Sequence, residues 1–109
     1  MAKFVISKRT NGEFQFSLKD DSGKILLGSE GYTTHAAVKN GVESVKKNAL
    51  IEAHIEKKES SNGKFFFNVK ASNGQVVATS HLHDTDAHRA EIIEAIKEAE
   101  HAPVEDETV

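Results

Sequence analysis

The sequence repeats itself at an offset of 51 residues, and this internal repeat constrains the fold more than any other feature. Residues 2–49 align on residues 53–100 without a gap, and 12 of the 48 aligned positions are identical. We therefore expect one folding unit to be used twice, as repeat 1 (2–51) and repeat 2 (52–109). The identical positions include a turn dipeptide and two aromatic residues: Asn11-Gly12 falls on Asn62-Gly63, and Phe14 and Phe16 fall on Phe65 and Phe67.

Each repeat is about half of the 109-residue chain, and units of that size bury too little surface to be stable alone. The two repeats are therefore expected to share one core in a single domain, 1–109. The longest apolar runs are too short to cross a membrane, and no leader segment is indicated. The chain has no cysteine, which excludes disulfides, thiolate metal ligands and a cysteine nucleophile. We expect a cytoplasmic protein with no membrane partner.

Residue patterns predict three strands and a helix in each repeat. In repeat 1, Asn11-Gly12 predicts a two-residue hairpin turn, and polar residues alternate with Phe14, Phe16 and Leu18 after it. A short third strand is expected at 25–27. Apolar residues then recur at helical spacing after a threonine that can cap the helix. The expected helical stripe is Val38, Val42, Val45 and Ala49, with Thr33 or Thr34 as the cap.

Repeat 2 follows the same plan. A strand is expected near 53–59, followed by a strand whose core face carries Phe65, Phe67 and Val69. The second helix is expected to begin near Asp84 or Thr85 and to end around 101–102, because Pro103 cannot continue it. Local pattern leaves two alternatives for 104–109, a short strand or a frayed end. The prediction is a pseudo-twofold α+β fold: two β-β-β-α(-β) repeats form a single antiparallel sheet with two helices on one face and the other face open.

Three segments resemble the YegP-like family, small bacterial proteins whose repeat is a domain of unknown function. They are Ser61–Ala71, the run from Ser29 to Thr34, and Gly41–Ala49. The resemblance implies a β-β-β-α-β repeat, in tandem or in two subunits, with C-terminal strands exchanged between the halves. It further implies that 104–108 forms a strand beside the first half and that 51–59 bridges the halves. It implies no activity, substrate or cofactor.

Repeat 2 departs from the family pattern at positions that repeat 1 retains. His83 stands where repeat 1 has Tyr32, and Ile92 stands where it has Gly41. The ending Asn48-Ala49 becomes 99–100, Ala-Glu. A glycine within a helix permits close approach of a neighbouring group, so we expect such an approach at Gly41 and none at Ile92.

One cluster has ligand chemistry: His81, His83 and His88, with two aspartates between them. Imidazole and carboxylate groups suit zinc, nickel or copper. The aspartates also have a sufficient local role at a helix N-terminus, and the cluster has no equivalent in repeat 1. We therefore expect no metal and no cofactor, with these three histidines as the weak candidates.

No nucleophile elbow, phosphate loop or other catalytic motif is present, so the chain is expected not to be an enzyme, although an enzyme of unidentified chemistry stays a third alternative. Nucleic-acid binding is the second alternative, disfavoured by a net charge of −3 and by phenylalanines that mostly face the core. The charge is uneven: 1–51 carries eight bases and five acids, and 52–109 carries six bases and twelve acids. An acidic last helix and tail that keep the protein dispersed explain this adequately.

The leading hypothesis is a non-catalytic binding or accessory module that uses the open face of the sheet. Phe66 faces away from Phe65 and Phe67, and its equivalent in repeat 1 is Gln15. Either it packs locally, against Val5, Leu26 or Val77, or it forms part of a patch that docks a protein partner. The candidate interaction face comprises Phe66, Gln15, Ser17, Asn68 and Lys70. Because the tandem repeat supplies an internal pseudo-dimer, we expect a monomer.

Overall fold

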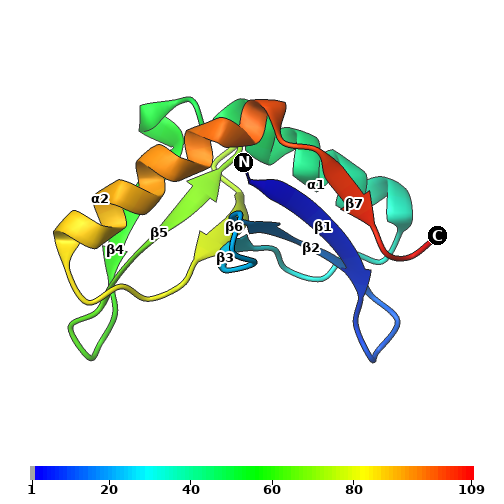
Figure 1. Cartoon of the computed structure of the whole chain (residues 1–109), viewed down its shortest axis with the longest axis horizontal. Coiled ribbons are helices and arrows are strands. Elements are labelled where there is room, and N and C mark those ends of the chain that lie inside the picture. The colour runs from blue at the N-terminus through cyan, green and yellow to red at the C-terminus, as the bar shows by residue number, and fades with distance from the viewer. Residues whose placement is uncertain (1) are drawn as a thin grey trace.

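The computed structural model describes residues 2–109 and contains one seven-stranded sheet covered by two helices (Figure 1). The strand order is β4-β5-β6-β3-β2-β1-β7. The elements of repeat 1 are β1 (Lys3–Lys8), β2 (Phe14–Lys19), β3 (Ile25–Gly28) and α1 (His35–Asn48). Those of repeat 2 are a 3-10 turn η1 (Glu52–His54), β4 (Ile55–Glu59), β5 (Phe65–Lys70), β6 (Val76–Ser80), α2 (Asp86–Ala95), a 3-10 segment η2 (Ile96–His101) and β7 (Val104–Asp106).

The two repeats use the same local devices to begin and end their elements. Gly12 and Gly63 close the first hairpin of each repeat with φ of 87° and 80°, values that a side chain would strain. The expected two-residue turn is wrong, because the Arg9 N–H donates to the Glu13 carbonyl and the loop has three residues, 10–12. Asn11 does not adopt the positive φ that a two-residue Asn-Gly turn needs. Thr34 caps α1 by accepting a hydrogen bond from the backbone N–H of Ala37, and Thr85 caps α2 in the same way. The helix starts expected from the sequence are therefore confirmed.

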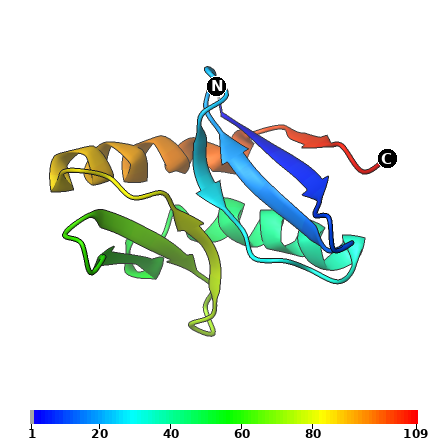
Figure 2. The ribbon, with the colours of Figure 1, turned by 90° about the horizontal axis from the view of Figure 1, so that it is seen from below.

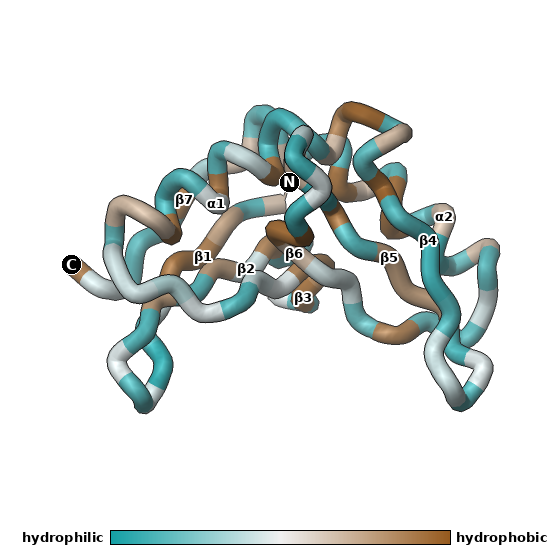
Figure 3. Tube along the Cα trace, turned by 180° about the vertical axis from the view of Figure 1, so that it is seen from behind, coloured by the Kyte–Doolittle hydropathy of each residue, from teal (hydrophilic) through white to brown (hydrophobic). Residues whose placement is uncertain are grey.

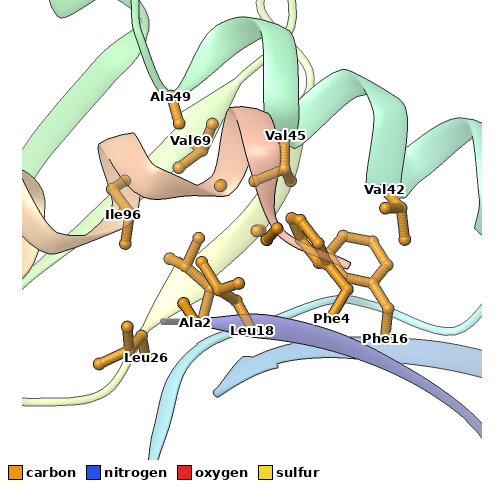
Figure 4. Close-up of a cluster of buried hydrophobic side chains, with 14 of the residues drawn as sticks. Ala2, Phe4, Phe16, Leu18, Leu26, Val42, Val45, Ala49, Val69 and Ile96 are labelled. Atoms are coloured by element: carbon orange, nitrogen blue, oxygen red, sulfur yellow. The ribbon is translucent and has the colours of Figure 1, made fainter. Parts of the chain in front are cut away.

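Both helices lie on one face of the sheet, and the opposite face is uncovered (Figures 1 and 2). The sheet bends into an arch whose two first hairpins point away from the helices. One apolar cluster between the layers draws on both repeats (Figure 4). Phe4 and Phe16 contribute from strands, Val45 from α1, and Ile96 from η2. The shared core and the pseudo-twofold α+β fold expected from the sequence are therefore present.

The expected antiparallel sheet requires one correction, because the sheet is mixed. Five of its six strand pairs are antiparallel, but β7 runs parallel to β1. Parallel neighbours cannot be joined by a tight hairpin, and here all the elements from β2 to η2 lie between β1 and β7 in the chain. The tail is therefore a strand paired with the first half, as the family resemblance implied.

The exchange of terminal strands occurs at one end of the sheet only. β7 of repeat 2 covers the outer edge of β1, whereas β4 is the last strand at the opposite end. The chain that leaves α1 makes the turn η1 and enters β4 directly, so it supplies no additional strand there. The segment 51–59 does link the halves, but as a turn and an edge strand.

The second helix is shorter than the pattern predicted. α2 ends at Ala95, and the following turns are 3-10 up to His101. Ile96 at this junction is completely buried, whereas Ile92 and Ile93 are only partly buried. Within 2–109, no helix combines the length and apolar character that a membrane crossing requires.

Candidate functional site

The open face carries a polar row that crosses the centre of the sheet. Strand register aligns Ser17 with Gly28, Gly28 with Thr79, and Thr79 with Asn68. The offset of 51 exchanges the two halves of this row, so the pseudo-twofold axis passes between Gly28 and Thr79. The space above the Gly28 Cα is open, because a Cβ built there meets nothing within 4 Å. The centre of this face is therefore a shallow polar surface.

The five residues of the candidate interaction face share this side of the sheet but fall into two groups. Ser17 and Asn68 are three strand spacings apart, ~14 Å at about 4.8 Å per strand. Gln15 lies in repeat 1, where its side chain accepts from Arg9 Nε at 2.7 Å and donates to the Ser7 hydroxyl at 3.2 Å. None of the five lines the cavities described below. The face is therefore better described as two flanks joined by a polar row than as one compact patch.

Phe66 occupies the flank that lies in repeat 2. It is half-buried and pairs with Lys58 on β4, with Asn68 two positions along its own strand. Three strands separate β5 from β1, so Phe66 does not pack against Val5, one of the local partners expected from the sequence. Leu26 instead joins the core cluster next to the bulge between β2 and β3, and Val77 packs against that cluster. Phe66 thus remains the aromatic side chain that the open face presents.

Two lysines near this face are paired with glutamates, whereas Lys58, which pairs with Phe66 across the strands, makes no ion pair with any residue of 2–109. Lys70 Nζ lies 2.7 Å from Glu56 Oε2, and Asn68 donates to Glu56 Oε1 at 3.0 Å. These hydrogen bonds, that from Lys70 first, hold the pKa of Glu56 below its usual value. On the other flank Lys3 pairs with Glu105 at 3.4 Å. The face is therefore polar without being strongly positive.

The histidine cluster is only partly assembled. His83 is buried, and its ring meets the edge of the His88 ring with centroids 4.7 Å apart, whereas His81 is exposed. Burial, reinforced by the nearby His88, lowers the pKa of His83, so its ring is neutral near pH 7. Its Nε2 has no hydrogen-bond partner among the described residues. Over 2–109, no three histidine, aspartate or glutamate side chains gather in a way that could hold a metal ion.

His83 belongs to a packing exchange between the repeats. In repeat 1, Tyr32 stacks on Phe16 with centroids 6.3 Å apart and lies against Gly41. A Cβ at Gly41 would lie 2.5 Å from the Tyr32 hydroxyl, so the glycine is required by this close approach, as expected from the sequence. Repeat 2 places the smaller ring of His83 with Ile92 at the equivalent positions, and both arrangements fill space between strand and helix.

Sequence reasoning missed Arg89, a buried side chain that links α2 to two strands. Its Nη1 donates to the Lys58 carbonyl at 2.9 Å and the Phe66 carbonyl at 3.4 Å, and its Nη2 lies 2.6 Å from Asp86. The guanidinium also lies over the Phe65 ring, 5.2 Å from its centroid. The available signal was its alignment with Val38, since a charged residue at a core position requires buried partners.

Sequence reasoning also missed a groove between α2 and the edge strand β4, here called the β4 groove. Its volume is about 570 Å³, and apolar side chains from α2, β4 and the end of α1 line it together with a few charged ones. A smaller cavity, about 240 Å³, lies between α1, β1 and β7. The β4 groove is lined by Ala49, Leu50, Glu52, Ile55, Lys57, Ala90, Ile93, Glu94 and Lys97.

These features define a class: a tandem-repeat α+β protein with one sheet, two helices on one face and a C-terminal strand returned to the first repeat. The family model described as Domain of unknown function (DUF1508) matches the chain twice, over 10–56 and 60–106. The chain belongs to this family, whose bacterial members include the YegP proteins.

Curated relatives and solved structures agree with this assignment. A UPF0339 protein from the ptx operon 5′ region of Stutzerimonas stutzeri is 48% identical over 100 residues, covering 92% of this chain and 88% of the relative. YegP of Escherichia coli K12 is 39% identical and covers 86% of each chain. The solution NMR structure of a UPF0339 protein from Shewanella oneidensis superimposes with a TM-score of 0.91 at 36% identity, covering 96% of this chain and 90% of that chain. The solution NMR structure of E. coli YegP, described as a protein of unknown function, gives the same TM-score and identity and covers 97% and 92%.

Proposed function

We propose that this protein is a cytoplasmic, non-catalytic binding module that engages a protein partner through the open face of its sheet. The observation that carries this proposal is the position of Phe66, half-buried on a face that no helix covers. Its equivalent, Gln15, is held by two side-chain hydrogen bonds, so symmetry of the fold does not require an aromatic residue here. An aromatic side chain on an uncovered polar face is typical of an interaction surface.

The charges of the open face support a protein partner over a nucleic acid. Lys70 and Lys3 are each paired with a glutamate on or beside the face. Binding to a phosphate backbone requires several cations that are free to replace counterions, and single-strand recognition requires several exposed aromatic rings. A single aromatic ring beside Lys58, with Lys70 and Lys3 paired to glutamates, fits neither requirement.

The proposal is tested by affinity capture from native lysate with the wild-type chain and Phe66→Gln, with and without nuclease. The substitution introduces the residue that repeat 1 carries at the same position, so the strand is expected to fold. We expect a protein partner to be captured by the wild type in both conditions and to be lost with Phe66→Gln.

Val109→Gln provides the control, because Val109 is an exposed apolar residue, 98% accessible, that belongs neither to the candidate interaction face nor to the β4 groove. It removes similar apolar surface but leaves the open face unchanged. Capture that survives Phe66→Gln, or that disappears with nuclease, contradicts a protein-binding role for the open face.

A further inference from the structure

We propose that the β4 groove is a peptide-binding site, which takes an extended acidic segment of a partner protein as an added parallel strand beside β4. This site lies on the helix side and at one edge of the sheet, so it is distinct from the open face. The occupant carries an apolar residue followed two positions later by an acidic residue. The protein's own β7 shows how such a strand is bound.

In repeat 1 the equivalent position is filled. β7 runs parallel to β1, with Val104 beside Phe4 and Asp106 beside Ile6. The backbone N–H of Phe4 donates to the Pro103 carbonyl at 2.9 Å, and the N–H of Glu107 donates to the Ile6 carbonyl at 2.9 Å. Val104 also lines the cavity between β1 and α1. A strand at this edge is therefore held by backbone bonds and by one apolar side chain.

The two cavities occupy equivalent places in the two repeats. The offset of 51 carries four residues of the smaller cavity onto residues of the β4 groove. Ile6, Lys39, Val42 and Glu43 correspond to Lys57, Ala90, Ile93 and Glu94. The β4 groove is more than twice as large because no strand lies in it: about 570 Å³ against about 240 Å³.

The backbone of β4 is available for such a strand. β4 is the terminal strand, and within 2–109 no other strand pairs with its outer edge. The offset maps the Phe4 and Ile6 groups that bind β7 onto Ile55 and Lys57. The N–H of Ile55 already donates to the Glu52 carbonyl, so η1 closes one end of the edge. The remaining edge groups, from the Ile55 carbonyl onward, can pair with an added strand.

The groove also selects for charge. With the β7 register, the apolar residue of the occupant lies beside Ile55, and the acidic residue lies beside Lys57. Lys57 is exposed, lines the groove and makes no ion pair with any residue of 2–109. Of the other charged lining residues, Glu94 is paired with Lys97 at 2.8 Å, and Glu52 lies in η1, at the end of the edge that η1 closes. Figure 3 shows the contrast with β1, which is mainly hydrophobic where β4 is hydrophilic. A lysine on an edge strand opposes pairing with a neutral or basic strand and favours an acidic one.

A second copy of the chain is a poorer occupant than a separate protein. The tail of each copy is already held on its own β1, and His35 Nε2 lies 2.6 Å from Asp106 Oδ2. A tail that moved to another copy would give up these contacts and would leave the edge of its own β1 uncovered. We therefore assign the site to a segment of a partner protein.

The probe is a synthetic peptide with the sequence of residues 102–109, which carries the Val104 and Asp106 pattern. It is titrated into the full-length ¹⁵N-labelled protein, and amide chemical shifts are followed. We expect saturable shift changes in β4 and α2. Lys57→Glu is expected to weaken binding at least about fivefold, because it replaces an ion pair with a repulsion.

Matched controls separate this site from general electrostatics and from misfolding. Lys58→Glu makes the same charge change on the adjacent residue, which belongs to the open face, and should change affinity by less than about twofold. Methylation of the peptide backbone nitrogen at the Glu107 position should abolish binding, because that N–H meets the Lys57 carbonyl. Methylation at the Asp106 position should leave binding intact, because in the β7 register that N–H points away from the neighbouring strand. Both methylated peptides are tested on the unchanged protein, so neither result can come from misfolding.

Shift changes in β1 and α1 would mean that the peptide displaces the native tail, and they would overturn the proposal. A dimer joined through β4 in the absence of peptide would overturn it in favour of a second copy. Absence of saturable change would overturn it as well. Phe66→Gln should leave peptide binding unchanged, so failure of the open-face proposal and failure of this one are distinguishable.

Discussion

The two repeats share a plan and a core but differ at their outer edges. In repeat 1, β7 covers the edge of β1, and the exposed fractions of Phe4 and Ile6 are 0% and 1%. In repeat 2, nothing in 2–109 covers β4, and its residues are half-buried or exposed. The repeats therefore share their hairpin turns, helix caps and core positions, and they differ in whether the outer edge of the sheet is covered. The core is common to the two repeats, and the difference between them lies at the outer edge, where β7 covers β1 and β4 is the terminal strand.

The largest expected effect tests the equivalence of the two halves at the core. Phe16 and Phe67 are equivalent residues and are 1% and 0% exposed. Phe16→Ala and Phe67→Ala should each lower the free energy of unfolding by about 3–5 kcal/mol, because both leave a large cavity. Urea denaturation measures this. Phe16→Leu and Phe67→Leu serve as milder variants if the alanine proteins do not fold, and a marked difference between the two sites would contradict a shared core.

The second effect concerns the packing exchange between Tyr32 with Gly41 and His83 with Ile92. Gly41→Ile should cost about 1–3 kcal/mol, because the new side chain overlaps the Tyr32 hydroxyl and approaches a Phe16 ring carbon. Adding Tyr32→His should recover part of the loss by reproducing the combination of repeat 2. A double-mutant cycle in urea measures the coupling, and simple additivity would show that the pairs are not alternatives.

The third effect, the loss of stability on removing a helix cap, should be nearly equal in the two repeats. Thr34 and Thr85 accept hydrogen bonds from the N–H groups of Ala37 and His88, at 3.1 Å and 3.0 Å. Thr34→Ala and Thr85→Ala should each cost about 1 kcal/mol, whereas serine at either position should retain most of the cap. Thermal melts of the four variants provide the comparison. A cap that proves silent in one repeat would show that its helix start is held by other contacts.

The smallest effect is a pH dependence specific to repeat 2. Because burial lowers the folded-state pKa of His83 below its ordinary 6.5, the unfolded chain binds a proton more readily. The stability contributed by neutral His83 is therefore complete above pH 6.5 and decreases as the pH falls below it. Urea midpoints between pH 8 and pH 5 should decline less steeply in His83→Gln than in the wild type. Parallel declines would assign the dependence to other histidines.

Most of the fold was predictable from local signals. Asn-Gly turns, alternating phenylalanines and threonine caps each act over a few residues, and the repeat doubled the evidence for every one. The sites were less predictable. The alignment showed that Phe66 and Gln15 are equivalent positions of the two repeats. Only the strand register showed that Ser17 and Asn68 lie in one row across the sheet. Arg89 was missed because its partners, the carbonyls of Lys58 and Phe66, are brought to it by tertiary folding.

By itself, the sequence determined the duplicated architecture, because hydrophobic period and turn chemistry are local properties of the chain. The tertiary structure alone decided the parallel pairing of β7 with β1 and, with it, the asymmetry of the sheet. β7 has only three residues, Val104–Asp106, and their local pattern does not distinguish a strand from an irregular end. Their conformation depends on the backbone groups of Phe4 and Ile6, about 100 positions earlier, and on α1, whose His35 contacts Asp106. The open edge of β4 is the counterpart of that choice, since one terminal segment can cover only one of two equivalent edges.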